Sequence, residues 1–451
     1  MSKVTIKSLR GLALMLAAFA VMATPSFAVT FNLTADNTTV TMPGPGGAVI
    51  PMWGFALGTW APDLAPVTIP GPMLVVPPGD NTLIINLTNN LPDNVSIVIP
   101  GQTAVMTPVW TDGTTGPRGG DLTKRVRSFT HETPPGGGPV AYTWNNVKPG
   151  TYMYHSGTHP QVQVSMGLYG GVKKDAATGL AYTATPPGNI DTSYNNEVIL
   201  FYSEIDPTLN NVVDNGTYGT PAYPSMVRYA PKYFLINGMP WPDAAPVVDH
   251  PIAINDNVLI RFLNAGLRYH VPSLGGLYMT VIAEDGNLYP YPKEHHSIFL
   301  APGKTKDAIL KPTVDNTYAV YDRTLHLTNA EVSGGGMLAY LDVGPPPPPP
   351  GTRLVDFDGD GKTDAAVWRP GNATWYVKRS SDGGTTAIKW GDSLLNDMLV
   401  PGDYDGDGKT DAAVWRPGNA TWYVKRSSDG GTTAIKWGDS LLNDVTIISL
   451  F

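Results

Sequence analysis

Cysteine is absent from the 451-residue sequence. A chain without thiols forms no disulfides and supplies no thiolates for structural zinc sites or iron–sulfur clusters. The fold must therefore be stabilised by packing or by hard metal ions with oxygen ligands, because no disulfide can cross-link it.

Charged residues are also scarce, at 15% of the chain, and give a formal net charge of −8 at pH 7. No basic run is present that could neutralise a series of phosphates, so we expect no nucleic-acid partner. A nucleophile elbow, a P-loop and a dinucleotide fingerprint are absent too, and the sequence assigns no catalytic residue.

Long hydrophobic runs are limited to one stretch, Gly11–Ala23, which is too short to span a bilayer comfortably. Basic residues precede it, and Ser26-Phe27-Ala28 fits a signal-peptidase site. We therefore predict a cleaved signal peptide over residues 1–28 and no membrane span in the mature chain. The product is expected to be exported to the periplasm, the cell surface or the medium.

Segments with helical periodicity are missing as well, whereas glycine and proline number 49 and 43. Short alternating segments bounded by turn residues, such as 82–88 and 258–263, are present instead. This pattern predicts an all-β fold built from sandwiches.

The chain divides into several predicted parts. Residues 29–185 and 190–343 each have the length of one sandwich, and residues 344–350 form a polyproline linker that is expected to be stiff and extended. The segment 351–451 contains a repeat, because residues 358–397 recur without a change at 405–444, with a period of 47 residues.

The segment Gly150–Val172 reads GTYMYHSGTHPQVQVSMGLYGGV. It resembles the end of the first domain of multicopper oxidases, where Tyr-His-Ser-His enters a copper cluster and Gly-Leu-Tyr-Gly follows. Other landmarks resemble this laccase-like family in the family's order: Ile69–Pro72, Pro78–Asp80, Asn89–Pro92, Trp110–Gly113, Phe234–Gly238, Arg261–Gly266 and Ala283–Gly286. The resemblance covers residues 30–343. It implies two cupredoxin-like Greek-key sandwiches, with copper held where domains meet.

The resemblance also shows that most copper ligands have been replaced. The family's His-x-His-Gly corresponds to Val98–Gly101, and the second histidine of Tyr-His-Ser-His corresponds to Gly157. The family's His-Cys-His motif, which ends in an axial methionine, corresponds to His326–Met337, with Leu327 in place of the thiolate. Type-1 copper requires that thiolate, so its usual site cannot form.

A reduced copper site remains a hypothesis, with His155, His159, His270, His326 and Met337 as its candidate ligands. If the domains meet as in the family, His155 and His326, joined by His270, would form a mononuclear centre. The alternatives are structural: His155 packs among tyrosines, His159 faces solvent and Met337 belongs to the core.

Each repeat begins with an acidic loop around a glycine turn. Its alternating carboxylates favour Ca²⁺, and the predicted ligands are Asp356, Asp358, Asp360, Asp364, Asp403, Asp405, Asp407 and Asp411. The twelfth position is valine and a strand-like segment follows, so the loop is not an EF-hand. It resembles the calcium loops of FG-GAP or VCBS repeats, which build β-propeller blades. The alternative is a solvated acidic turn.

Two functions are consistent with the sequence. One is an exported binding or surface scaffold that keeps at most a reduced copper site. Its calcium-binding repeats would attach it to an extracellular or cell-surface protein or polysaccharide. The other is a copper-dependent oxidoreductase that acts on a metal ion or a phenol through a non-standard site.

Overall fold

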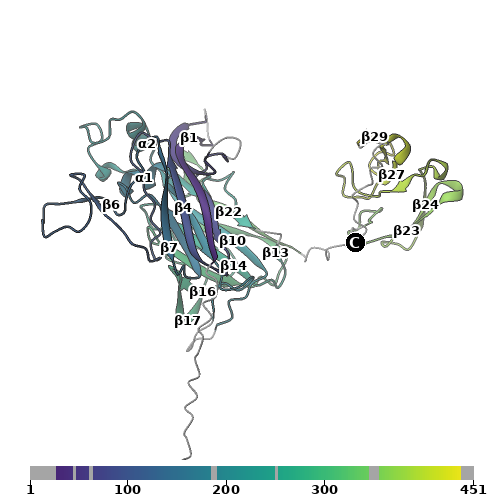
Figure 1. The fold of residues 1–451 in the computed structure, drawn as a ribbon. Helices are drawn as coiled ribbons and strands as arrows, with labels where there is room; N and C mark the ends of the chain where they lie inside the picture. The colour runs from purple at the N-terminus through teal and green to yellow at the C-terminus, as the bar shows by residue number, and fades with distance from the viewer. Residues whose placement is uncertain are drawn as a thin grey trace, which may run out of the picture. The chain divides into compact units, whose positions relative to one another are not determined.

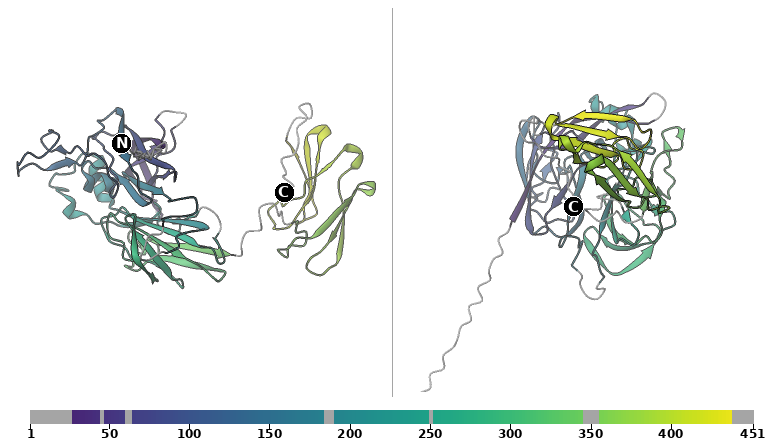
Figure 2. Two further views of the ribbon diagram at one scale, coloured as in Figure 1. Left: turned by 60° about the horizontal axis from the view of Figure 1, so that its bottom comes forward. Right: turned by 90° about the vertical axis from the view of Figure 1, so that its right-hand side faces the viewer.

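The computed structural model describes residues 27–43, 47–59, 64–183, 190–248, 252–344 and 355–437. The chain forms two compact units, Met1–Pro345 and Pro346–Phe451. Strands dominate both units (Figures 1 and 2), which confirms the all-β prediction. Residues 1–26 of the predicted signal peptide and Pro345–Pro350 of the predicted linker lie outside the described residues. Within the described part of the chain, no helix is long and apolar enough to cross a membrane.

The first sandwich contains a four-stranded sheet in the order β2-β1-β4-β7. Its strands are β1 (Phe27–Thr41), β2 (Val49–Leu57), β4 (Asp80–Asn89) and β7 (Gly137–Asn145). Along β4, Leu83, Ile85 and Leu87 are fully buried, whereas the residues between them are only half-buried. The alternating pattern in the sequence therefore sets which face of this sheet forms the core.

A three-stranded sheet, ordered β3-β9-β8, contributes further side chains to this core. It consists of β3 (Gly71–Val76), β8 (Gly150–His155) and β9 (Tyr169–Lys174); helix α1 (Pro160–Met166) joins the last two, and β5 (Val109–Trp110) and β6 (Val126–Ser128) form a separate pair. Leu74, Tyr154 and Val172 from this sheet join the same hydrophobic cluster as Leu83 and Ile85 of β4.

The second sandwich is built on a nine-stranded sheet in the order β17-β16-β18-β14-β10-β11-β20-β21, with β12 paired to β10. Its strands are β10 (Asn196–Ile205), β11 (Tyr233–Ile236), β12 (Val247–Val248), β14 (Val258–Asn264), β16 (Met279–Glu284), β17 (Asn287–His295), β18 (Thr305–Leu310), β20 (Thr328–Asn329) and β21 (Val332–Ser333). The other sheet, β13-β22-β19-β15, contains β13 (Ile252–Ala253), β15 (Pro272–Leu274), β19 (Asn316–Asp322) and β22 (Leu338–Gly344). Helix α2 (Pro207–Asp214) and the 3-10 turn η1 (Met226–Arg228) follow β10.

Strand β10 is buried along its whole length because both of its faces are covered. Val198, Leu200 and Tyr202 belong to the core of the second sandwich. Ile199 and Phe201 point the other way and join a cluster that includes residues of β8 and β9. The two sandwiches therefore share an apolar interface.

An ionic network lies at the same interface, centred on the fully buried Arg261 of β14. Its guanidinium group donates to Glu197 at 2.6 Å, to Asp175 at 2.5 Å and to the hydroxyl of Thr151 at 2.9 Å. Thr151 in turn donates to Asp307 at 2.6 Å. Burial would lower the pKa of Arg261, but the carboxylates of Asp307 and Glu197 raise it, so the group is held as a cation. These contacts tie β8 to β14 and β18 of the second sandwich.

The second unit consists of two small antiparallel sheets. The first contains β23 (Ala365–Arg369), β24 (Thr374–Lys378) and β25 (Thr385–Lys389), with the 3-10 turns η2 (Pro370–Asn372) and η3 (Ser393–Leu395) beside it. The second contains β26 (Met398–Leu399), β27 (Ala412–Arg416), β28 (Thr421–Lys425) and β29 (Thr432–Lys436), with the turn η4 (Pro417–Asn419) after β27. Each sheet is one blade of the predicted repeat.

Candidate functional site

The first sandwich is closed where the family resemblance implies copper ligands. Val98 and His155 lie side by side, and the backbone N–H of each donates to the carbonyl of the other at 3.0 Å. A Cβ placed on Gly157 would lie only 2.8 Å from Cγ1 of Val98 and 3.0 Å from Oγ of Ser96. No side chain fits at position 157 without a shift of its neighbours, so the two altered motifs pack against each other.

Hydroxyl groups fill the space around Gly157. Ser96 Oγ lies 2.9 Å from Ser128 Oγ. The hydroxyl oxygen of Thr158 lies 3.0 Å from Ser96 Oγ and 3.1 Å from a carboxylate oxygen of Glu132. Ser96, Ser128 and Thr158 are all buried, and they satisfy one another. Neutral hydroxyls with mutual hydrogen bonds are poor ligands for copper, so this region does not fit a copper cluster.

The two candidate ligands in the first sandwich have different surroundings. His155 ends β8, and its Nδ1 lies 2.9 Å from the carbonyl oxygen of Ser156. Burial lowers the pKa of His155, so its imidazole is neutral at pH 7. His159 directly precedes α1 in a left-handed conformation with φ of 39°, and it is exposed to solvent.

The second sandwich brings two other candidates together around an aspartate. Nδ1 of His270 lies 3.0 Å from Oδ2 of Asp322, and Nδ1 of His326 lies 2.9 Å from the same oxygen. On the other side of His270, Nε2 lies 3.2 Å from a carboxylate oxygen of Glu204. Ligand atoms of His270, Asp322 and His326 all lie within 4.8 Å of one another, as a metal site requires.

Hydrogen bonds determine the charges in this group. Burial alone would lower the pKa of His270, but its bonds to Asp322 and Glu204 raise it above its usual value. Burial would likewise raise the pKa of Asp322, but hydrogen bonds from His270, His326 and Thr324 hold it well below its usual range. An imidazole between two carboxylates can donate from both nitrogens only as a cation, so this arrangement favours the charged form of His270.

The backbones of Met337 and His326 are joined by a hydrogen bond, in which the N–H of Met337 donates to the carbonyl of His326 at 2.9 Å. Its side chain is fully buried in the hydrophobic core of the second sandwich. The His326 ring stacks on Phe234, with ring centroids 4.0 Å apart. The structure thus brings His326 and His270 together, whereas His155 and His159 lie in the first sandwich.

Sequence reasoning missed the two carboxylates of this group. Asp322 ends β19, where Tyr318, Val320 and Asp322 occupy alternate buried positions. An aspartate in phase with core residues is unusual and could have marked a buried polar site. Glu204 carried a similar signal, because it lies in the apolar segment that forms β10.

The acidic loops of the repeats adopt matching conformations. In the first, oxygens of Asp356, Asp358 and Asp360 lie within 4.8 Å of one another. In the second, the three carboxylates that lie this close are those of Asp403, Asp405 and Asp411, so the group includes the counterpart of Asp364 in place of that of Asp360. Asp364 has a different environment, because its carboxylate accepts backbone N–H bonds from Phe357 at 2.8 Å and Ser380 at 2.7 Å. Asp411 accepts the matching bonds, and Asp407 accepts from the hydroxyl of Ser427 at 3.0 Å.

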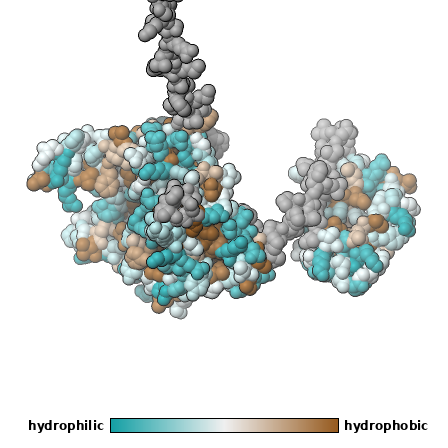
Figure 3. Space-filling model, turned by 90° about the horizontal axis from the view of Figure 1, so that it is seen from below, coloured by the Kyte–Doolittle hydropathy of each residue, from teal (hydrophilic) through white to brown (hydrophobic). Residues whose placement is uncertain are grey.

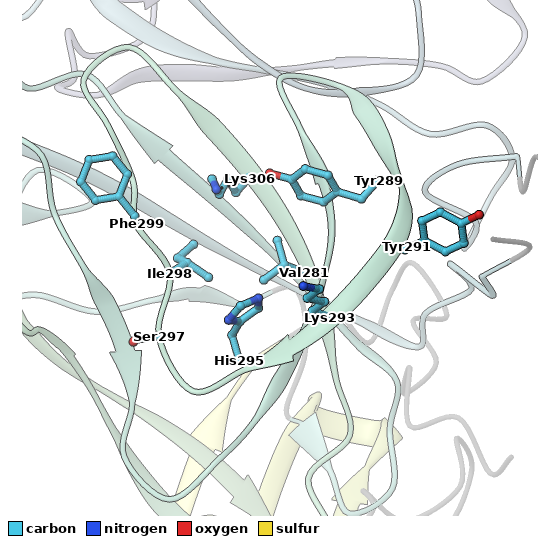
Figure 4. A pocket seen from close by; sticks show the side chains of 9 residues that line it. All are labelled: Val281, Tyr289, Tyr291, Lys293, His295, Ser297, Ile298, Phe299 and Lys306. Carbon is cyan, nitrogen blue, oxygen red and sulfur yellow. Dashed lines mark hydrogen bonds between the residues drawn. The ribbon is translucent and has the colours of Figure 1, made fainter. Parts of the chain in front are cut away.

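A cavity of about 390 Å³ lies at the edge of the second sandwich, beside β17. The cavity lies at a sheet edge, because β17 is the terminal strand of the larger sheet and does not belong to the smaller sheet. Val281 and Ile298 form an apolar floor, and Tyr289, Tyr291 and Phe299 contribute aromatic rings (Figure 4). Figure 3 shows the side of the first unit on which β16 and β17 lie, where hydrophobic and hydrophilic residues are mixed on the surface.

Lysine and histidine side chains add positive charge and donors to this cavity. Lys293 and His295 are alternate residues of β17 and both line the cavity (Figure 4). Lys306 also lines it but is neutralised by Glu284 at 3.3 Å. Within the described residues, Lys293 has no carboxylate within ion-pair distance. The cavity therefore combines apolar and aromatic walls with one unpaired cation.

Comparisons with known proteins agree with this architecture. Residues 67–173 match the multicopper oxidase family, and residues 356–414 match the FG-GAP-like repeat family. No curated protein matches the chain. The blue copper oxidase from Nitrosomonas europaea is similar in structure, with 20% identity, a TM-score of 0.52, and coverage of 70% of this chain and 86% of that one.

A second structure, the multicopper oxidase mgLAC, has 21% identity and a TM-score of 0.51, with coverage of 74% of this chain and 92% of that one. At these identities the likeness concerns the fold. The predicted resemblances are thereby confirmed: this chain joins multicopper-oxidase-like cupredoxin sandwiches, which contain no cysteine, to FG-GAP-like repeats.

Proposed function

We propose that this chain is an exported binding scaffold that has kept the sandwiches of a multicopper oxidase without the oxidase mechanism. The observation that carries the proposal is the contact between Val98 and Gly157, which closes the region where the family resemblance implies copper ligands. The missing cysteine removes the thiolate through which type-1 copper would receive electrons. Together these two changes would interrupt electron transfer between the copper sites of an oxidase, whereas the sandwiches themselves are kept.

The binding role is supported by the cavity beside β17. Its aromatic walls suit a planar ring, and Lys293 supplies a charge for an anionic group. The ligand class that fits is an aromatic carboxylate of one or two rings. The acidic repeats would add attachment to an extracellular or cell-surface protein or polysaccharide.

A reduced copper site in the second sandwich is the remaining copper hypothesis. His270, Asp322 and His326 fit copper by donor type, because two imidazoles and a carboxylate suit a divalent ion. A bound copper ion would supply redox chemistry there, which is the basis of the alternative function as an oxidoreductase for a metal ion or a phenol. Metal binding would compete with the proton that His270 holds between Asp322 and Glu204.

Copper loading tests these functions. The full chain is incubated with Cu²⁺, desalted and examined for bound metal, visible absorbance and oxygen uptake with a phenolic substrate. The scaffold proposal expects no intense blue band and no oxygen uptake above that of free copper. Rapid uptake that is lost in His326→Gln, but kept in the exposed control His159→Gln, would establish the oxidoreductase instead.

We also propose that Ca²⁺ binds the loops that begin each repeat. Carboxylate oxygens gathered within 4.8 Å, as those of Asp356, Asp358 and Asp360 are, repel one another unless a cation joins them. Calcium should therefore raise the melting temperature of the second unit. The rise should shrink in Asp358→Asn but persist in Asp382→Asn, whose carboxylate pairs with Arg379 outside the loop. An equal rise in both variants would contradict specific binding.

A further inference from the structure

The two blades of the second unit pack through opposite faces. Trp375 of the first blade is buried against Ala412 and Val414 of the second, and these three residues form one hydrophobic cluster. In addition, the indole N–H of Trp390 donates to the carbonyl of Tyr423 at 2.9 Å. We call the side of a blade that carries Trp375 and Trp390 its front face, and the side that carries Val414 and Tyr423 its back face.

The strand pairing confirms that these are different faces of the sheet. In β27, Ala412 and Val414 alternate with Ala413 and Trp415. Ala413 and Trp415 belong to a separate cluster on the front face of the second blade. A single blade therefore has two apolar faces, and the contact inside the chain uses one face of each blade.

Because the two repeats are identical over 40 positions, each blade carries both faces in sequence. The back face of the first blade is formed by Ala365, Val367 and Tyr376, which correspond to Ala412, Val414 and Tyr423. Val414 is fully buried, whereas Val367 is 63% exposed. The same valine is thus a core residue in one blade and a surface residue in the other.

The front face of the second blade shows the complementary difference. Ile435 and Trp437 correspond to Ile388 and Trp390, which are packed against the blade interface. Ile435 is 44% exposed and Trp437 is 78% exposed. Within residues 355–437, the unit therefore exposes one half of the blade interface on the first blade and the other half on the second blade.

We propose that a second copy of this chain docks head to tail on the repeats, with its Trp437 face on the Val367 face of the first copy. The contact would reproduce the interface already present inside each chain. The Trp437 indole would donate to the Tyr376 carbonyl as Trp390 donates to Tyr423. Lys378 would lie over Trp437 as Lys425 lies over Trp390, where the ammonium is 5.9 Å from the ring centroid.

Such a contact uses different surfaces on the two partners, so each copy keeps one free half. Repeats are stabilised by burial against neighbouring repeats, which gives this association its driving force. Propellers close with about 4–8 blades, so two to four copies would complete a ring of paired blades. The proposal goes beyond the binding scaffold and depends on neither copper nor calcium.

Two substitutions test the proposal, one on each face. Val367→Glu and Trp437→Glu place a charge in the proposed contact, and both positions are exposed, so each variant should fold as the wild type does. The control is Val314→Glu, because Val314 in the second sandwich is 59% exposed, close to the value for Val367. Masses of the full chain are measured by light scattering or sedimentation, and folding is checked by circular dichroism and melting.

We expect the wild type and Val314→Glu to form assemblies of two to four copies, and each face variant to be a monomer. An equimolar mixture of the two face variants should form a dimer, because one intact half remains on each partner. A monomeric wild type at about 100 µM would overturn the proposal. Assemblies that persist in both face variants, or a mixture that stays monomeric while the wild type assembles, would also overturn it.

Discussion

Replacing Gly157 with alanine tests whether the first sandwich is as tightly closed as its contacts indicate. The added Cβ would lie 2.8 Å from Val98 and 3.0 Å from Ser96, closer than van der Waals contact allows. The backbone of Gly157 lies outside the left-handed region, so alanine adopts it without strain. Any loss of stability would therefore come from crowding.

The expected magnitude follows from two opposing effects. A glycine-to-alanine change that fits its backbone stabilises a protein by about 0.4–1 kcal/mol through the unfolded state. Overpacking costs about 1–3 kcal/mol, and the contacts around Gly157 include a buried valine that has little room to move. We expect a net loss of about 1–2 kcal/mol, or a fall in melting temperature of about 2–6 °C.

A double-mutant cycle makes the reasoning specific. Val98→Ala alone should cost about 2 kcal/mol through lost burial and a cavity. In the double variant the methyl group of alanine 157 occupies part of that cavity, so the two losses should not add. We expect a favourable coupling of about 1–2 kcal/mol between the two positions.

Calorimetry of the full chain measures these values, with Gly79→Ala as the matched control. A Cβ at Gly79 would have no neighbour within 4 Å, and this residue also belongs to the first sandwich. The control should leave the melting temperature unchanged or slightly raised. The reasoning would be refuted if Gly157→Ala behaved like the control or if the losses in the double variant simply added.

Three further predictions concern the second sandwich and its interface. Arg261→Met should strongly lower the melting temperature of the first unit, because the buried carboxylates around this residue would lose their counter-charge. The expected loss in the free energy of unfolding is about 3–5 kcal/mol, and a change of less than about 1 kcal/mol would contradict this role. In a metal-free buffer the His270–Asp322 pair should stabilise the fold most between about pH 4 and pH 6.5. The raised pKa of His270 implies that its contribution is lost as pH rises through that pKa, and the lowered pKa of Asp322 implies a loss in strong acid. Melting temperatures of the wild type and His270→Asn across this range should differ most near pH 6 and converge at alkaline pH; parallel curves would exclude the assignment. In a titration followed by ligand-observed NMR, 2-naphthoate should bind the wild type, and Lys293→Gln should weaken this binding about fivefold. The exposed control Lys311→Gln should not weaken it, and the neutral 2-naphthalenemethanol should bind both variants equally. Equal binding of the anion to both variants would refute the cavity assignment.

Local patterns in the sequence were sufficient for the architecture. The alternation along residues 82–88 identified the buried face of β4, and the repeat at residues 358–397 and 405–444 identified two blades. The replaced ligand motifs, with Gly157 in place of a histidine, likewise point to a change in the first sandwich. All of these signals lie within short segments, which is why they can be read without a fold.

Non-local contacts could not be read in the same way. Glu204 meets His270 across 66 residues of sequence, and Asp307 meets Thr151 across 156. The alternation along residues 258–263 indicates a strand with one buried face, but β14 is buried on both faces, and the partners of Arg261 come from distant parts of the sequence. The two copies of the repeat show the limit most clearly, because identical residues such as Val367 and Val414 differ in burial only through their neighbours.

The packing of Val98 against Gly157 also bears on the history of the chain. A mutation that returned histidine to position 157 would meet the valine side chain at once, and a histidine at position 98 would find no partner imidazole at Gly157. Each single substitution to histidine would therefore cost stability before a bound metal could offset that cost. The packing at these two positions thus makes a copper cluster in the first sandwich hard to regain by single substitutions, whatever metals bind elsewhere in the chain.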